Sequence, residues 1–287
     1  MRDLRPMLFV VVIILITSAS PAATPWFSRV LVTNDDGIDD PRLHALARAF
    51  ADVAEVVVVA PSENCSGSSN YVSVFSEREL TAAPYDMGEG ITAWVVEGFP
   101  GDCVLLALET IMKDAPPDLL VSGVNAGPNL ADAWIASGTI GVARLAAHAG
   151  LPAVAFSNLT PDAPSMMAAV PQWCVALAAT DAVRDLPAGG YLNVNFPRCT
   201  ADEVAGVVWA GIGDPIFHDT FETGVLGEDG RTTWKLKWWM DREGPQPDEG
   251  DVARHRANYV TVTPMQIGDF KGVLPLEKAA GLPSWTR

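Results

Sequence analysis

The chain has 287 residues, of which 49% are hydrophobic, so it is long enough for one large domain with its own core. Acidic residues outnumber Lys and Arg by 35 to 19, which gives a formal net charge of −16. Because nucleic-acid binding depends on a basic surface, this balance argues against a nucleic acid as a specific partner.

The first 23 residues have the pattern of a secretory signal peptide. Arg2 and Arg5 precede an unbroken apolar run at residues 7–16, and small residues follow it. The apolar run is too short to span a bilayer comfortably, so an uncleaved membrane anchor is only the alternative. We therefore expect residues 1–23 to be cleaved, with no stable membrane span afterwards and a secreted or periplasmic location.

The stretch from Val30 to Gly37 predicts a buried strand that ends in two carboxylates. A run of apolar and β-branched residues leads into Asn34, Asp35 and Asp36, and the glycine then breaks the strand. Neighbouring side chains of a regular strand point to opposite faces, so the two carboxylates share a target only if the strand has already ended. Such a pair suits a hard divalent cation, although a plain solvated turn is the simpler interpretation.

The following segments alternate between helical and strand patterns. Strands are predicted at 56–60, 93–96, 119–122, 153–157 and 192–196, and helices at 41–50, 103–112, about 139–148 and about 165–183, the second of them capped by Asp102. This alternation predicts an α/β fold, Rossmann-like and doubly wound, with a mostly parallel sheet. We expect residues 24–200 to form this core.

Residues 201–287 differ in character and predict a β-rich C-terminal extension or arm that completes the same domain. Trp234, Trp238 and Trp239 lie close together, and residues 259–263 have a strand pattern. Exposed aromatic side chains there would indicate an oligomer contact, whereas a small satellite core is the alternative.

The cysteines and histidines predict neither a zinc site nor a disulfide framework. Four scattered cysteines show no metal-ligand spacing, and the four histidines fall in no metal or triad pattern. A disulfide between Cys174 and Cys199 is conceivable but is not fixed by the sequence.

Three strand ends carry polar clusters that a parallel sheet would place along one edge. They contain the two aspartates, a hydroxyl-rich loop around Ser66, and Asn125, which together offer only oxygen ligands. The turn at 137–139 adds a helix N-terminus, which is a ready anion site. A divalent metal beside an anion pocket suits phosphoester hydrolysis, although each segment alone also fits a surface loop, a turn or a helix cap.

These motifs resemble the SurE family of metal-dependent survival-protein nucleotidases. The resemblance is carried by residues 32–37, 59–61 with 66–70, 98–108, 121–129 and 137–139, and by a C-terminal strand at 259–264. It implies a phosphomonoesterase that removes phosphate from nucleoside monophosphates as a 5'/3'-nucleotidase. It also implies an oligomer that exchanges C-terminal segments, which we expect to be a homodimer or homotetramer.

The resemblance also implies the roles of particular residues. One divalent cation, Mg²⁺ or Mn²⁺ with Ca²⁺ as a crystal substitute, would be held by Asp35, Asp36, Ser66 and Asn125, and the two aspartates are the catalytic candidates. The candidate phosphate or substrate contacts are Asn34, Gly67, Asn129, Ser137, Gly138 and Thr139.

The chain departs from the family pattern without losing a candidate metal ligand. The departures lie at Cys65, Phe99, Gly101, Ala131 and Ala133, and they bear on substrate preference. Those at Phe99, Ala131 and Ala133 also motivate one alternative, an exported protein that binds a nucleotide or phosphate without turnover.

A second alternative is a nucleoside hydrolase. The acidic run loosely resembles the calcium-binding strand end of that family, in which Asp39 or Asp40 would also ligate the metal. Free base would then be the product in place of phosphate.

Overall fold

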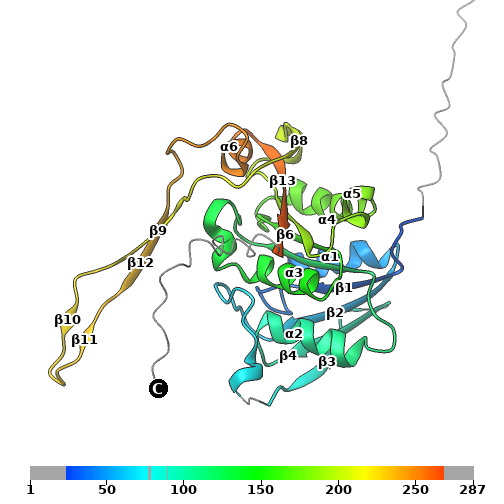
Figure 1. The fold of residues 1–287 in the computed structure, drawn as a ribbon, viewed down its shortest axis with the longest axis horizontal. Coiled ribbons are helices and arrows are strands. Elements are labelled where there is room, and N and C mark those ends of the chain that lie inside the picture. The colour runs from blue at the N-terminus through cyan, green and yellow to red at the C-terminus, as the bar shows by residue number, and fades with distance from the viewer. Residues whose placement is uncertain (1–23, 77–78, 89, 268–287) are drawn as a thin grey trace, which may run out of the picture.

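The computed structural model describes residues 24–76, 79–88 and 90–267, so the predicted signal peptide lies outside the described residues. A mixed sheet of nine strands forms its centre (Figure 1). In sheet order the strands are β3 (Ala82–Tyr85), β4 (Ile91–Val96), β2 (Glu55–Pro61), β1 (Arg29–Thr33), β5 (Leu119–Asn125), β6 (Ala153–Ser157), β7 (Gly190–Asn195), β13 (Tyr259–Gln266) and β8 (Gly206–Trp209).

The six strands from β4 to β7 run parallel, as the sequence predicts. The antiparallel neighbours lie towards the edges, where β3 pairs with β4 and β13 pairs with β7. The last described strand, β13, therefore completes the sheet that the N-terminal segments begin.

Helices cover both faces of the sheet, as a doubly wound fold requires. The helices are α1 (Pro41–Ala51), α2 (Pro100–Leu106), α3 (Gly138–His148), α4 (Pro164–Ala178), α5 (Asp181–Arg184) and α6 (Asp251–Arg256). Short turns of 3₁₀ helix lie at Ser73–Ser76, Ala131–Ile135 and Ala201–Glu203, and a π turn extends α2 over Ala107–Ile111. None of the helices in the described ranges is long and apolar enough to cross a bilayer.

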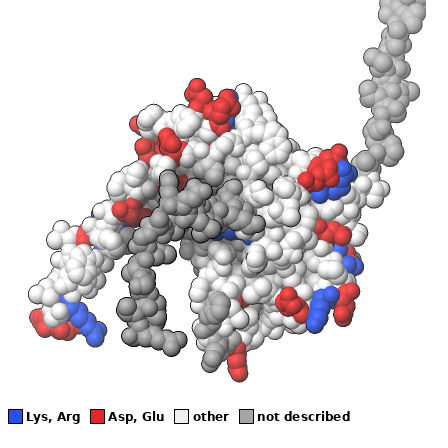
Figure 2. Space-filling model, viewed as in Figure 1, with Lys and Arg blue, Asp and Glu red and all other residues white. Residues whose placement is uncertain are grey.

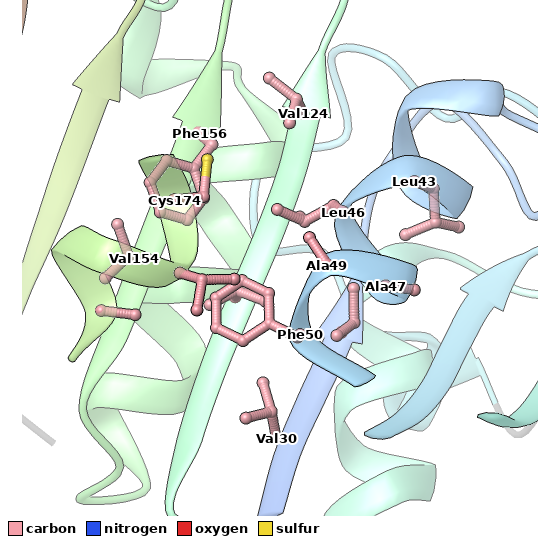
Figure 3. Packing of buried hydrophobic residues seen from close by; sticks show 14 of the residues in the cluster. Val30, Leu43, Leu46, Ala47, Ala49, Phe50, Val124, Val154, Phe156 and Cys174 are labelled. Atoms are coloured by element: carbon pink, nitrogen blue, oxygen red, sulfur yellow. The ribbon is translucent and has the colours of Figure 1, made fainter. Parts of the chain in front are cut away.

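The alternation of β1 divides its side chains between two cores. Val30 and Val32 pack with α1 and α4 on one face, whereas Leu31 packs with α2 and α3 on the other. Figure 3 shows the first core, in which Phe50 of α1 lies over the sheet between Val30 and Val154. Each fully buried side chain of this size contributes about 1.5–3 kcal/mol, so β1 is fixed from both faces before its polar end begins.

Two helix predictions need correction. The second helix begins at Pro100 and not near Cys103, because proline suits the first helical position and Phe99 provides the extended N-cap. Asp102 therefore lies in the first turn of the helix and is not its cap residue. The helix predicted over 165–183 is two helices, α4 and α5, which are separated at Thr180.

Residues 217–240 form a long two-stranded arm that projects from the body (Figure 1). The arm consists of β9 (Phe217–Phe221), β10 (Val225–Leu226), β11 (Thr232–Thr233) and β12 (Leu236–Met240). Trp234, Trp238 and Trp239 are each more than half exposed, so a satellite core does not explain them. A small buried cluster does lie at the base of the arm, where Ile216 packs with Leu130 and Val252. Figure 2 shows charged groups of both signs at the tip of the arm, while the surface between the tip and the body is mostly uncharged, with a few acidic groups.

All four cysteines are free in the structure, including the conceivable pair. Cys174 is fully buried in the core of α1 and α4, while Cys199 is only partly buried.

Candidate active site

The polar ends of β1, β2 and β5 lie side by side, because these strands are adjacent and parallel. The register pairs Thr33 of β1 with Ser122 of β5, so the segments that follow these two strands leave the sheet at the same level. The predicted convergence of distant segments along one edge is therefore present in the fold.

Immediately after β1, a tight turn redirects the chain. The Asn34 side chain donates to the carbonyl of Gly37 at 2.9 Å and accepts the Gly37 N–H at 3.3 Å. Gly37 has a φ of 109°, which glycine adopts without the strain of a side chain. Asn34 thus closes the turn that presents the two aspartates, and its predicted phosphate contact stays a prediction.

Asp35 is held by the N-terminus of α3. Its Oδ1 accepts a hydrogen bond from the Thr139 hydroxyl at 2.6 Å, and the backbone N–H groups of Gly138 and Thr139 also act on the carboxyl. Burial raises the pKa of Asp35, and these hydrogen bonds oppose the increase. The N-terminus of α3, which was predicted to bind a phosphate, therefore binds the Asp35 carboxylate in the structure.

Gly138 permits this close approach. A Cβ at residue 138 would lie 2.7 Å from both the Cβ and Oδ2 atoms of Asp35. The preceding Ser137 caps the helix, since its Oγ accepts the Ile140 N–H at 3.1 Å.

Asp36 lies beside the β5 loop and a buried arginine. Its side chain is 6% exposed, and burial raises its pKa to about 6, although the Arg42 guanidinium acts in the opposite direction. The Ala126 N–H also lowers the Asp36 pKa, which places the carboxyl next to the residue after Asn125. One carboxylate oxygen, Oδ2, is buried without a hydrogen bond from the described residues and lies 3.2 Å from Arg42 Nη2.

Arg42 is the main residue that the sequence analysis missed. It pairs with Asp40 through its Nε and Nη2 atoms and donates to the Leu159 carbonyl at 3.3 Å. A basic residue in the first turn of a helix opposes the helix dipole, and that was the available signal that it pairs with acids.

The loop after β2 reaches the same site. The Cys65 N–H donates to the Asp35 carbonyl at 2.7 Å, and the Asn64 side chain approaches Asp36 Oδ1 at 3.5 Å. Ser66 and Gly67 are exposed and line a hollow beside this loop.

The β5 loop supplies an amide at the opposite side. Asn125 donates its Nδ2 to the Gly127 carbonyl at 2.9 Å, which fixes the side chain and leaves its Oδ1 available as an acceptor. The backbone carbonyl of Asn125 accepts the N–H groups of Asn158 and Leu159, which anchors the loop to the end of β6.

Asn129 belongs to a buried polar network. Its Nδ2 donates to Ser157 Oγ at 2.8 Å, and its backbone atoms bond the side chains of Asn193 and Asn195. The network gives Asn129 a structural role, and its predicted contact with substrate is not tested by the structure.

Asp39 and Asp40, the additional metal ligands of the nucleoside hydrolase alternative, bond other side chains of the protein. Asp39 is exposed and accepts the Tyr85 hydroxyl at 2.7 Å, while Asp40 is paired with Arg42. Both carboxylates already have partners within the chain, and Asp40 shares Arg42 with Asp36, so the structure does not favour a ligand set extended along this acidic run.

Within the described ranges, no group of three or more His, Cys, Asp and Glu side chains could hold a metal ion. The candidate donors are instead two carboxylates, a hydroxyl and an amide oxygen, and this all-oxygen set suits Mg²⁺ or Mn²⁺. Asn125 Oδ1 is available for such an ion, and Asp36 Oδ2 accepts no hydrogen bond from the described residues but is ion-paired with Arg42.

A family profile described as "Survival protein SurE" matches residues 30–219. "5'-nucleotidase SurE 1" of Burkholderia lata is 38% identical over 252 residues, which cover 85% of this chain and 92% of that protein. "5'/3'-nucleotidase SurE" of Cronobacter sakazakii is 38% identical over 242 residues, covering 83% of this chain and 90% of the relative.

A solved structure agrees with the sequence relatives. The crystal structure of the SurE protein from Aquifex aeolicus has a TM-score of 0.70 and 26% identity, and the match covers 88% of this chain and 99% of that one. The predicted α/β fold and the predicted resemblance are both confirmed. This chain belongs to the SurE family.

Proposed function

We propose that this protein is a phosphomonoesterase of the nucleotidase type, which hydrolyses nucleoside monophosphates to nucleoside and phosphate. The observation that carries the proposal is the meeting of two buried carboxylates, Asp35 and Asp36, with the N-terminus of α3 and the loops after β2 and β5. The nucleotidase names of the relatives, which match most of the chain, support the same reaction.

Asp35, Asp36, Ser66 and Asn125 would hold one divalent cation, Mg²⁺ or Mn²⁺. When bound, such an ion polarises a phosphoryl oxygen and lowers the pKa of a bound water. The Arg42 guanidinium lies 3.2 Å from Asp36 Oδ2, and its positive charge offsets part of the repulsion between the two carboxylates.

Asp35 and Asp36 would have different roles in the reaction, because their surroundings differ. Asp35 is immobilised by the Thr139 hydroxyl and by backbone N–H groups of α3, which suits a fixed ligand. Asp36 is held less tightly, since the Asn64 side chain lies 3.5 Å from its Oδ1, so its carboxylate would orient the attacking water and accept its proton.

The phosphate would lie between the Ser66 loop and the start of α3. Because Gly138 and Thr139 already serve Asp35, the donors left for a phosphate are the backbone N–H of Gly67 and the hydroxyl hydrogen of Ser137. Donors of this kind stabilise the charge that develops on the phosphoryl oxygens in the transition state.

Two further parts of the proposal concern assembly and location. The exposed tryptophans of the arm support a homodimer or homotetramer formed through that segment. The basic and apolar pattern of residues 1–23 supports export to the periplasm or beyond.

The test is phosphate release from nucleoside monophosphates in the presence of Mg²⁺ or Mn²⁺. We expect Asp35→Asn and Asp36→Asn to lower the rate by roughly 100-fold or more, because each removes a charge from the reacting centre. Asp39→Asn is the matched control, since Asp39 is exposed and bonded to Tyr85. Equal rates in the wild type and Asp36→Asn would refute the proposed function of this site.

A further inference from the structure

We propose that the hollow beside the Ser66 loop binds the nucleobase of the substrate, and that Phe99 provides its stacking surface. This inference rests on the proposed function and adds a specificity-determining residue to it. The candidate catalytic residues, Asp35 and Asp36, have no aromatic ring on which a base could stack.

The hollow has a volume of about 860 Å³ and lies between the loop after β2 and the end of β4. Ser66 and Gly67, which are proposed to meet the cation and the phosphate, form part of its wall, and Phe99 lines it as well. A ligand whose phosphate lies at Ser66 therefore has room for its remaining part in the hollow.

Phe99 lines the hollow just after the end of β4 and packs against Tyr71. The rings of Phe99 and Tyr71 meet edge to face, with centroids 4.7 Å apart and an interplanar angle of 78°. Tyr71 is half exposed and Phe99 is partly exposed, so this pair is not part of the core. Stacking on such a ring stabilises the binding of any nucleobase, whichever polar groups the base carries.

Asp102 makes this wall rigid. This residue is 2% exposed, and its carboxylate accepts the Phe99 N–H at 2.9 Å, the Ser73 N–H at 2.6 Å and the Ser73 hydroxyl at 2.8 Å. The segments that carry the two rings are therefore tied to one buried group. Gly101 allows their close approach, because a Cβ there would collide with the Tyr71 carbonyl.

The polar side of the hollow favours bases that donate hydrogen bonds. Glu63 is an exposed carboxylate in its lining, and Asn64 and Ser62 add amide and hydroxyl groups. A carboxylate attracts the exocyclic amino groups of adenine, guanine or cytosine and repels additional phosphate groups. The structure thus assigns the hollow to the base end of the substrate.

The experiment compares adenosine monophosphate with ribose 5-phosphate, which has the same ester and sugar but no base. Phe99→Leu keeps an apolar side chain but removes the ring. We expect it to lower kcat/KM for adenosine monophosphate about tenfold relative to kcat/KM for ribose 5-phosphate, mainly by raising the KM for adenosine monophosphate. Trp209→Leu is the control, because Trp209 is an exposed aromatic on β8, far along the sheet from β4. An unchanged ratio in Phe99→Leu would overturn the proposal.

Calorimetric binding of adenosine separates this inference from the proposed function. Adenosine carries no phosphate, so its affinity reports on the hollow even in a protein that releases no phosphate. We expect its dissociation constant to rise about tenfold in Phe99→Leu and to stay near the wild-type value in Trp209→Leu. Equal affinity in the wild type and Phe99→Leu would contradict a base site here whatever the activity.

Discussion

Gly138→Ala is a sharp perturbation of the site, because two physical effects predict opposite signs. Alanine is favoured over glycine in a helix by about 0.5–1 kcal/mol, so propensity alone predicts a more stable protein. In the structure, however, the new Cβ would lie 2.7 Å from both Cβ and Oδ2 of Asp35, whose side chain is buried and has little room to move.

The collision should outweigh the propensity. Overpacking in a buried site costs about 1–3 kcal/mol, and weakening the hydrogen bonds of a charged carboxylate costs about 1.5–3 kcal/mol. After the gain in propensity, the two costs together predict that the free energy of unfolding falls by about 1.5–5 kcal/mol. Catalytic geometry tolerates displacements of only about 0.5 Å, so phosphate release should also fall sharply.

Denaturant unfolding and a phosphate assay measure both effects on the same protein. Gly211→Ala is the matched control, because its Cβ would meet only the Glu249 carbonyl at an ordinary 3.9 Å. The reasoning would be refuted by a Gly138→Ala protein that is at least as stable and as active as the wild type.

Three further changes follow from the same contacts. Thr139→Val removes the hydroxyl that bonds Asp35, so unfolding free energy should fall by about 1.5–3 kcal/mol in urea titrations, and an unchanged midpoint would contradict that bond. Burial lowers the pKa of His255 in the folded state. The contribution of this residue to stability is therefore complete above its ordinary pKa of 6.5, and it is lost as the pH falls through the lowered pKa of the folded state. His255→Gln should therefore lose less stability on acidification than the wild type, and equal losses in parallel unfolding curves would exclude this role. Replacing Trp238 and Trp239 by serine should reduce the assembly size in sedimentation velocity, because both are exposed on the arm, and an unchanged oligomer would rule out assembly through these side chains.

The parts of the fold that local pattern controls were predictable. The apolar run of β1 and the helical spacing of α1 are properties of neighbouring residues, and both elements appear where they were predicted. The shared edge of β1, β2 and β5 also followed, since adjacent parallel strands end on the same side.

The parts that depend on distant contacts were not predictable. Thr139 and Asp35 are 104 residues apart, and nothing local indicates that the helix end would bind a carboxylate of its own chain. The start of α2 was missed for a different reason, because Pro100 was a usable signal for the first helical position.

The arm shows the limit of composition as a guide. Clustered tryptophans fit both a small core and an exposed surface, and only the pairing of β9 with β12 outside the main sheet distinguishes the two. Arg42 was missed although its place in the first turn of α1 was a signal, but the identity of its partners, Asp36 and Asp40, depends on the geometry of the turn.

The most direct measurement of the central claim is a calorimetric titration with Mn²⁺ of the wild type, Asp36→Asn and Asp39→Asn. The account predicts one site in the wild type, at least about tenfold weaker binding in Asp36→Asn, and wild-type affinity in Asp39→Asn. Equal Mn²⁺ affinity in the wild type and Asp36→Asn would contradict the claim that the strand-end loops form one cation site.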